Sequence, residues 1–296
     1  MIGDLEEPVD DSIRLLEIFM PQDGWLVSFA EAYMDESYRK GSPYLTVAGY
    51  LFRRSGARGF AKAWGPYLNR KMGYRWFHMT DLIARKDIFK NRKDGEDDII
   101  ARRLIEETHK WSAFGFAVTV DEPVYERLIG GRWGLPPKAF GFALLQAMIL
   151  VRRWTARAEF DGQISYFFEQ GNDHQKEADH FLTQLVQKSP VNSARYRYRM
   201  HAFLPKETHW LHPADMLAWH WSLEMQRQEE EKRIYPVRGD LQALIGREQD
   251  KTMHYDAGQL AALADDLTRS YGAREPDWQT FNWEAFRRPD LSPSPA

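Results

Sequence analysis

Acidic residues accompany apolar runs at three places in the chain, and these acids are the first candidates for chemistry. Asp35 follows residues 32–34, Glu169 follows residues 164–168, and Asp215 lies within a third apolar segment. A strand that ends in an acid places it at a sheet edge, where open α/β sheets bind ligands. If the three acids converge, their oxygens suit a hard cation such as Mg²⁺, which keeps several waters and binds substrate phosphates.

This donor set predicts metal-assisted hydrolysis of phosphodiesters. We expect Asp35, Glu169 and Asp215 to hold one or two Mg²⁺ or Mn²⁺ ions, about 4 Å apart if there are two, which activate a water and stabilise the leaving oxygen. Each acid alone also has a simpler explanation. The helix dipole favours Asp215 in a first helical turn, and Asp35 and Glu169 are also typical of turn acids that face water.

Four further residues are secondary candidates for the same site. Lys206 is expected to neutralise charge on the phosphate, although lysine is more often a solvated surface residue. Glu36 and Asp81 are reserve ligands, and Glu36 could simply pair with a nearby base. His78 follows two aromatic residues and is typical of a packed histidine, but a place beside the acids would make it a proton-transfer group.

A histidine cluster overlaps the third acid and raises the alternative of zinc. His209, His212, Asp215 and His220 lie within twelve positions. Imidazole and carboxylate are good zinc ligands, and a catalytic zinc site needs three of them. The spacing matches no known zinc motif, and His220 lies five residues after Asp215, which separates the two on a helix surface.

The best local signal for nucleic acid is a run of alternating arginine and tyrosine. In a strand, Arg195, Arg197 and Arg199 would share one face, and Tyr196 and Tyr198 the other. An exposed edge strand of this kind could guide a phosphate backbone past the acids. The alternative is an ordinary sheet with one solvated face.

The segments that must position these residues are strands first, then alternating strands and helices. Strands are expected at residues 25–34, 44–52, 114–120, 164–168 and 196–203, the first two as a hairpin. Helices are expected at residues 58–72, 98–111 and 138–157, after an N-cap at Asp173, around Pro213, and after Asp256. Residues 85–98 are expected to form an exposed charged loop.

This order of elements resembles that of a ribonuclease H-like sheet. The resemblance implies that the first strand, the fourth strand and a late helix each carry one metal-binding acid. The motifs also resemble the domain of unknown function 3800 family of bacterial proteins. They are Asp-Glu-Ser at residues 35–37, an acid closing a strand at residues 168–172, and Lys206 followed by an Ala-Asp helix start at residues 211–218. The resemblance covers roughly residues 25–221.

The predicted fold is therefore α/β, with a ribonuclease H-like mixed five-stranded sheet flanked by helices. Residues 25–228 are expected to form this domain, after an N-terminal extension at residues 1–24. Residues 229–288 are expected to be a C-terminal helical elaboration, and residues 289–296 a disordered tail rich in Pro and Ser.

Composition agrees with a globular protein and limits its partners. The 296 residues are 43% hydrophobic and 14% aromatic, enough for a packed core. The absence of Cys excludes disulfides and thiolate chemistry. The acidic N-terminus differs from a secretory signal, no apolar run has membrane-spanning length, and the cytoplasm is the expected compartment. A net charge of −3 argues against binding of nucleic acid by a large basic surface, so any such binding must depend on local basic residues.

The function predicted from these features is a metal-dependent nuclease or related phosphodiester hydrolase. The sequence lacks the nucleophile elbow of serine hydrolases, the phosphate loop of nucleotide-driven motors and the glycine pattern of dinucleotide-binding folds. The alternative is a catalytically silent module of the same fold that binds nucleic acid or a protein partner.

Overall fold

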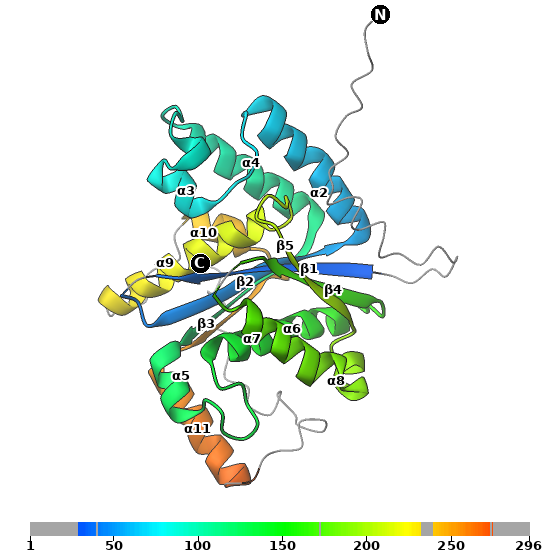
Figure 1. Cartoon of the computed structure of the whole chain (residues 1–296), viewed down its shortest axis with the longest axis vertical. Coiled ribbons are helices and arrows are strands. Elements are labelled where there is room, and N and C mark those ends of the chain that lie inside the picture. The colour runs from blue at the N-terminus through cyan, green and yellow to red at the C-terminus, as the bar shows by residue number, and fades with distance from the viewer. Residues whose placement is uncertain (1–28, 40, 172, 232–238, 273, 275–296) are drawn as a thin grey trace, which may run out of the picture.

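A six-stranded mixed sheet runs through the centre of the protein (Figure 1). The computed structural model describes residues 29–39, 41–171, 173–231, 239–272 and 274. The strands are β1 (Phe29–Tyr38), β2 (Tyr44–Arg53), β3 (Ser112–Asp121), β4 (Gln163–Glu169), β5 (Tyr198–Leu204) and β6 (Lys251–Tyr255). Their spatial order is β5-β4-β1-β2-β3-β6, which puts β1 and β4 side by side in the middle.

The strand directions follow from the length of the connections. β1, β2 and β3 pair antiparallel in sequence order, and the tight turn between β1 and β2 includes Gly41 at a φ of +86°. Such a positive φ suits glycine, which has no Cβ to clash with the backbone. β4 runs parallel to β1 and β5 parallel to β4, with helices in the long connections that parallel pairing requires.

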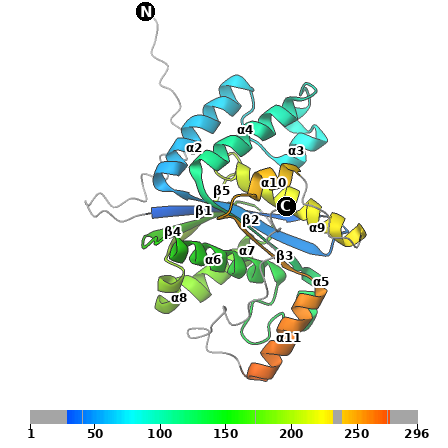
Figure 2. The same ribbon diagram turned by 180° about the vertical axis from the view of Figure 1, so that it is seen from behind.

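Helices cover both faces of the sheet and enclose two apolar cores (Figures 1 and 2). One face carries α2 (Arg54–Pro66), its π-helical continuation η1 (Tyr67–Lys71), α3 (Met79–Ala84), η2 (Asp87–Phe89), α4 (Glu96–Trp111), α9 (His212–Glu231) and α10 (Gly239–Ile245). The other carries α6 (Ala139–Arg157), α7 (Gln175–Phe181), η3 (Leu182–Gln187) and α8 (Pro190–Arg195), while α5 (Glu122–Leu128) packs with α11 (Ala257–Tyr271) beyond them. Because β1 alternates, Ala32 and Met34 enter the core under α6, and Tyr33 enters the core under α9.

The structure confirms the predicted α/β class, but the expected number of strands was wrong. The sixth strand, β6, pairs parallel with β3 at one edge of the sheet. It lies within residues 229–288, which therefore contribute a strand as well as helices. Its sequence, Lys-Thr-Met-His-Tyr, is short, and only Met253 and Tyr255 pack against the apolar core, so its pairing depends on the edge that β3 offers.

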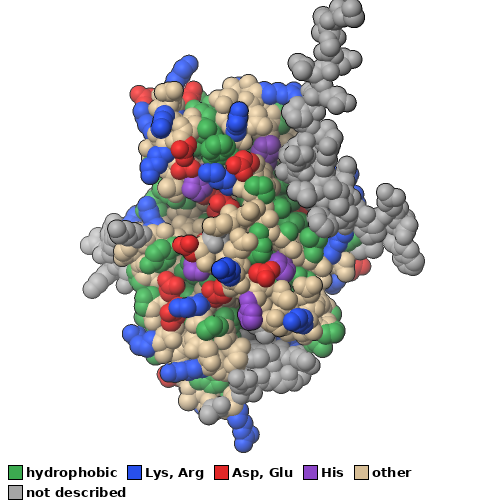
Figure 3. Space-filling model, in the orientation of Figure 1, with side chains coloured by type: hydrophobic (Ala, Val, Ile, Leu, Met, Phe, Trp, Pro, Cys, Tyr) green, Lys and Arg blue, Asp and Glu red, His purple; other side chains and the backbone are tan. Residues whose placement is uncertain are grey.

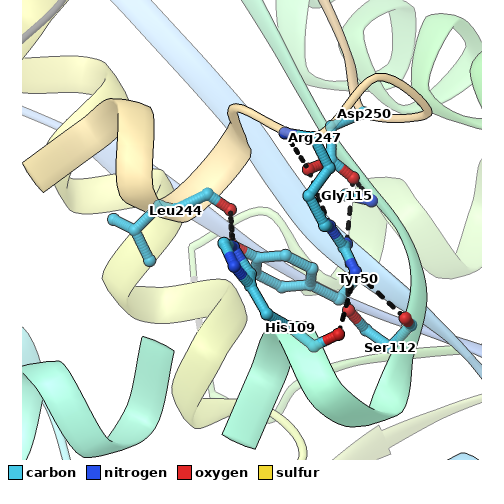
Figure 4. A network of polar contacts seen from close by, with 7 residues as sticks. All are labelled: Tyr50, His109, Ser112, Gly115, Leu244, Arg247 and Asp250. Atoms are coloured by element: carbon cyan, nitrogen blue, oxygen red, sulfur yellow. Dashed lines mark hydrogen bonds and ion pairs between the residues drawn. The ribbon is translucent and has the colours of Figure 1, made fainter. Parts of the chain in front are cut away.

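A polar clamp holds the segment before β6 against β3 (Figure 4). Asp250 is fully buried, pairs with Arg247 at 2.9 Å, and accepts a hydrogen bond from the Gly115 amide at 2.7 Å. Arg247 also donates to the Ser112 carbonyl oxygen at 3.0 Å, and the Tyr50 hydroxyl donates to the Leu244 carbonyl oxygen at 2.7 Å. These buried bonds connect α10 and β6 to β2 and β3.

Several predicted boundaries need correction. Asp173 is not an N-cap, because α7 begins after His174 without a side-chain cap. Asp256 does cap α11, as predicted, and forms a capping box with Gln259. The charged stretch 85–98 contains η2 and the first turn of α4, and its Arg92 is buried in an ion pair with Asp97 at 2.6 Å.

Some expectations lie outside the described residues. These are the N-terminal extension at residues 1–24, the start of the first strand at residues 25–28, and the tail at residues 289–296. Among the helices of the described segments, none combines the length and the apolar character needed to span a bilayer.

Candidate functional site

Asp35 and Glu169 occupy neighbouring positions on the two central parallel strands. The last paired residues of β1 and β4 are Met34 and Phe168, so Asp35 and Glu169 come next on the same face. Tyr33 and Phe167 mark that face, since both lie in the core under α9 and their rings stack at 5.0 Å. Glu169 ends β4 as expected, whereas Asp35 lies within β1, which continues to Tyr38.

This position in the sheet suits a binding site. From β1 the chain continues outward through β2 and β3 on one side, and from β4 it continues to β5 on the other. Ligands of open α/β sheets bind at the carboxyl ends of strands where the connections diverge in this way.

Asp215 reaches the same site from the first turn of α9, where Pro213 suits the helix start. Two indole groups hold this end of α9 against α2. Trp210 donates a hydrogen bond to the Ala57 carbonyl oxygen at 2.8 Å, and Trp64 donates to Nδ1 of His212 at 2.9 Å. These buried anchors fix the position of Asp215 over β1.

The charges of the three acids act on one another. Burial raises the pKa of Asp35 well above its usual value, and the charges of Asp215, Glu36 and Glu169 raise it further. The pKa of Asp215 is raised to about 6, mainly by burial and in part by the charge of Glu169, while His78 and the Met79 amide act in the opposite direction. Asp35 and Asp215 have only 8% and 7% of their surface exposed. Ionising these buried acids therefore lowers the free energy of unfolding, since burial and the neighbouring negative charges disfavour the charged forms.

The N-terminus of α3 supplies contacts to Asp215 that the sequence did not predict. The Met79 amide donates to Oδ2 of Asp215 at 2.7 Å. Nε2 of His78 lies 3.5 Å from Oδ1 of Asp215, and Nδ1 of His78 lies 3.1 Å from Oδ2 of Asp81. His78 is thus beside the acids, the condition under which the sequence made it a proton-transfer candidate. In the sequence, the three-residue spacing of His78 and Asp81 could have indicated that these two side chains pair.

Lys206 also lies at the site, in the loop between β5 and α9. Burial raises the pKa of Glu169, while the positive charges of His78 and Lys206 lower it. The Lys206 ammonium nitrogen lies 4.9 Å from the centre of the Trp76 ring. The Lys206 ammonium group therefore interacts with both Glu169 and the Trp76 ring.

The two reserve ligands differ in position. Asp81 contacts His78, and its charge raises the pKa of both Glu169 and Asp215. Glu36 follows Asp35 in the strand and therefore points to the opposite face. There a hydrogen bond to Glu177 raises the pKa of His174, and the charge of Glu36 raises it further.

Of the histidines in the zinc alternative, His212 is committed to other bonds. Both ring nitrogens of His212 have protein partners: Nδ1 accepts from Trp64, and Nε2 lies 3.2 Å from the Lys206 carbonyl oxygen. Burial lowers the pKa of His212 well below its usual value, which agrees with a neutral ring. His209 is buried against Gly65, where an added Cβ would lie 2.6 Å from the imidazole.

The arginines do not form the expected row on one strand. Arg195 ends α8, Arg197 has a positive φ of 50° in the turn that follows, and only Arg199 lies in β5. The guanidinium of Arg199 lies 4.4 Å from the centre of the Phe29 ring. Burial raises the pKa of Glu31, and the charge of Arg199 offsets part of that increase. Strand β5 is nevertheless an edge strand beside acid-bearing β4, the position considered above for a nucleic-acid contact.

The three acids do not form a closed metal cage. Across the described ranges, no group of three or more His, Asp or Glu side chains is arranged to hold one ion. A cation at this site would therefore need further oxygens from water or from a phosphate, as Mg²⁺ commonly does.

Comparison with known proteins gave no match to a family model, a curated protein or a solved structure.

Proposed function

We propose that this protein is a metal-dependent nuclease or related phosphodiester hydrolase on a ribonuclease H-like sheet. The observation that supports this best is the meeting of Asp35, Glu169 and Asp215 at the carboxyl edge of β1 and β4. The strand order β3-β2-β1-β4-β5 and the strand directions agree with that fold, with β6 as an addition. The motif resemblance to the domain of unknown function 3800 family points the same way.

The donor chemistry of the site fits a divalent cation. Asp35 and Asp215 are buried acids whose pKa values burial raises, and a positive charge between them would favour their ionised forms. Carboxylate oxygens suit Mg²⁺ or Mn²⁺, so Asp35, Glu169 and Asp215 would hold the cation. When bound, such a cation activates water and offsets charge on a phosphodiester oxygen.

The other residues of the site have complementary roles in this proposal. Lys206 supplies a positive charge near Glu169 that would pair with a substrate phosphate. The Met79 amide holds one oxygen of Asp215 and leaves the other directed toward His78. This bond fixes the orientation of the carboxylate before substrate arrives, which lowers the reorganisation that catalysis requires.

Aromatic and cationic side chains beside the site support nucleic acid as the substrate. Lys206 lies over Trp76, and the Arg39 guanidinium lies 5.3 Å from the centre of the Trp219 ring. Trp219 is one helical turn beyond Asp215, and Arg39 directly follows β1. Cations pair with phosphates and indole rings stack on bases, which is how proteins hold single strands. Arg195 and Arg197, just before β5, are proposed to extend this contact along the β5 edge, whereas the Arg199 guanidinium lies over the Phe29 ring.

The test is cleavage of labelled single- and double-stranded DNA and RNA with Mg²⁺ or Mn²⁺. We expect the wild type to cleave one of them and Asp35→Asn to lose that activity. Glu31→Gln is the matched control, since Glu31 is also a buried acid of β1 on the same face but lies four residues from Asp35. Equal activity in Asp35→Asn and wild type would contradict the proposal.

One observation favours the second candidate, a catalytically silent binding module. In the described part of the chain, no three acids are arranged so that they could bind one ion together. If no substrate is cleaved but labelled strands still bind, and Lys206→Ala weakens that binding, the module is the better description. Retained affinity in Asp35→Asn would then agree with binding that needs no cation.

A further inference from the structure

His78 lies beside Asp215, although a metal site made only of carboxylates would not need a histidine there. Nε2 of His78 lies 3.5 Å from Oδ1 of Asp215, which is long for a hydrogen bond. Two donors on one tetrahedral ion with bonds of about 2.1 Å lie about 3.4 Å apart. The observed separation therefore suits two neighbouring ligands of a common cation.

The ring of His78 is also held in the orientation that a ligand needs. Nδ1 lies 3.1 Å from Oδ2 of Asp81. A cation bound at Nε2 takes the place of any proton there, so the remaining ring hydrogen lies on Nδ1, where the Asp81 carboxylate accepts it. Histidine ligands typically donate their other N–H to a carboxylate in this way, which fixes the tautomer and makes the ring more basic.

Access and backbone support agree with a ligand role. The His78 side chain is 29% exposed, so water or a phosphate oxygen can reach the remaining coordination positions. The residue precedes α3 in an extended conformation, and the next amide, that of Met79, is bound to Asp215. The backbone therefore positions the imidazole and the carboxylate relative to each other.

We propose that His78 is a metal ligand through Nε2, so that the site takes a first-row transition dication held by imidazole and carboxylate. Imidazole nitrogen favours ions such as Zn²⁺ or Fe²⁺ over Mg²⁺, which prefers oxygen, and Mn²⁺ serves as the paramagnetic probe of the site. Asp81 acts as a positioning residue that orients His78. This inference rests on the proposed metal site but names a ligand and a class of metal that the three acids alone do not specify.

The experiment is Mn²⁺ titration of the full chain, followed by pulsed electron paramagnetic resonance of the bound ion. We expect a ¹⁴N coupling from a bound imidazole in the wild type and its loss in His78→Gln. The Kd for Mn²⁺ should rise about tenfold or more in His78→Gln and in Asp81→Asn, a loss typical of altered ligand support. Mg²⁺ affinity should change much less in both variants.

His201→Gln is the matched control. His201 also faces an aspartate, with Nε2 3.0 Å from Oδ1 of Asp179, but its ring packs with Tyr198 and Phe203 in the core under α6. This variant should keep both the ¹⁴N coupling and the Mn²⁺ affinity. Circular dichroism and thermal melting establish that each variant is folded.

The outcomes separate this inference from the proposed function. Bound Mn²⁺ without ¹⁴N coupling, coupling that persists in His78→Gln, or no Mn²⁺ binding by the wild type would each overturn the ligand role. If Mn²⁺ binds with the expected coupling but no nucleic acid is cleaved, the ligand stands and the nuclease function fails. If cleavage depends on Asp35 while His78→Gln binds Mn²⁺ normally, the nuclease function stands and the ligand fails.

Discussion

At the scale of single residues, the buried acids determine how the protein responds to pH. Asp35 and Asp215 are nearly inaccessible, and burial raises the pKa of each carboxyl group. In the unfolded chain both groups lose their protons near pH 4. The folded state therefore retains protons that the unfolded state has released, and its stability falls as the pH rises through that interval.

The first prediction concerns Asp215, whose pKa rises from 3.8 to about 6. In metal-free buffer, the free energy of unfolding should decrease between pH 4 and pH 6 by on the order of 2 kcal/mol relative to Asp215→Asn. The variant keeps an oxygen for the Met79 amide but cannot ionise. Urea unfolding of both proteins at several pH values measures the difference. Parallel pH profiles would contradict the raised pKa.

The second prediction concerns the balance between stability and activity at Asp35. Replacement by Asn removes a buried charge that neighbouring acids disfavour, so the free energy of unfolding at pH 7 should increase. Cleavage should fall about 100-fold or more, the effect typical of losing a group that stabilises transition-state charge. Thermal melting and initial rates measure the two effects. A variant that is both less stable and fully active would contradict the assignment.

At the scale of elements, short segments that look unremarkable in the sequence hold the site and the sheet together. The six-residue helix α3 brings His78 and Met79 to Asp215, and the five-residue strand β6 completes the sheet. Neither segment has an apolar pattern strong enough to predict it. Both are held by buried polar bonds to distant parts of the chain.

The third prediction tests the clamp that holds β6. Asp250→Ala should leave Arg247 without its buried partner and reduce the free energy of unfolding by about 3–5 kcal/mol. Glu248→Ala, at an exposed position beside the clamp, should change it by less than about 0.5 kcal/mol. Urea unfolding measures both, and hydrogen exchange should locate the loss in β6. Equal stability of the two variants would contradict the role of the clamp.

At the scale of the whole molecule, charge is mixed on the surface. Basic, acidic and histidine side chains interleave across the face in Figure 3, and the net charge is −3. A surface of this kind gives little long-range attraction for polyanions. Binding of nucleic acid would therefore depend on a few local cations near the site.

The fourth prediction follows from this local binding. Each phosphate contact to a single strand contributes about 0.7 to the slope of log K against log salt concentration. A double variant, Arg195→Ala with Arg197→Ala, should reduce the magnitude of that slope by about 1.4. Arg199→Ala is the control and should leave the slope unchanged, because its guanidinium already lies over Phe29 and acts on buried Glu31. An unchanged slope in the double variant would exclude phosphate contacts by this turn.

Local pattern predicted a large part of the architecture. The hairpin of β1 and β2, the apolar strands β3 and β4, the long buried helix α6 and the capped helix α11 all follow from periodicity, turn residues and capping. These signals work because each reports the exposure or backbone preference of residues close together in the chain. The strand expected at residues 196–203 begins later, because Ser189 and Pro190 start α8, a helix that the alternation of Arg and Tyr concealed.

The sequence by itself determined the α/β class and marked Asp35, Glu169, Asp215 and Lys206 as candidates. Only the tertiary structure decided that these side chains share one edge, that His78 and Asp81 join them, and that Glu36 faces away. The physical reason is that burial and electrostatic coupling arise from groups distant in the chain. The contact between His78 and Asp215 spans 137 positions, and no local pattern specifies such a contact.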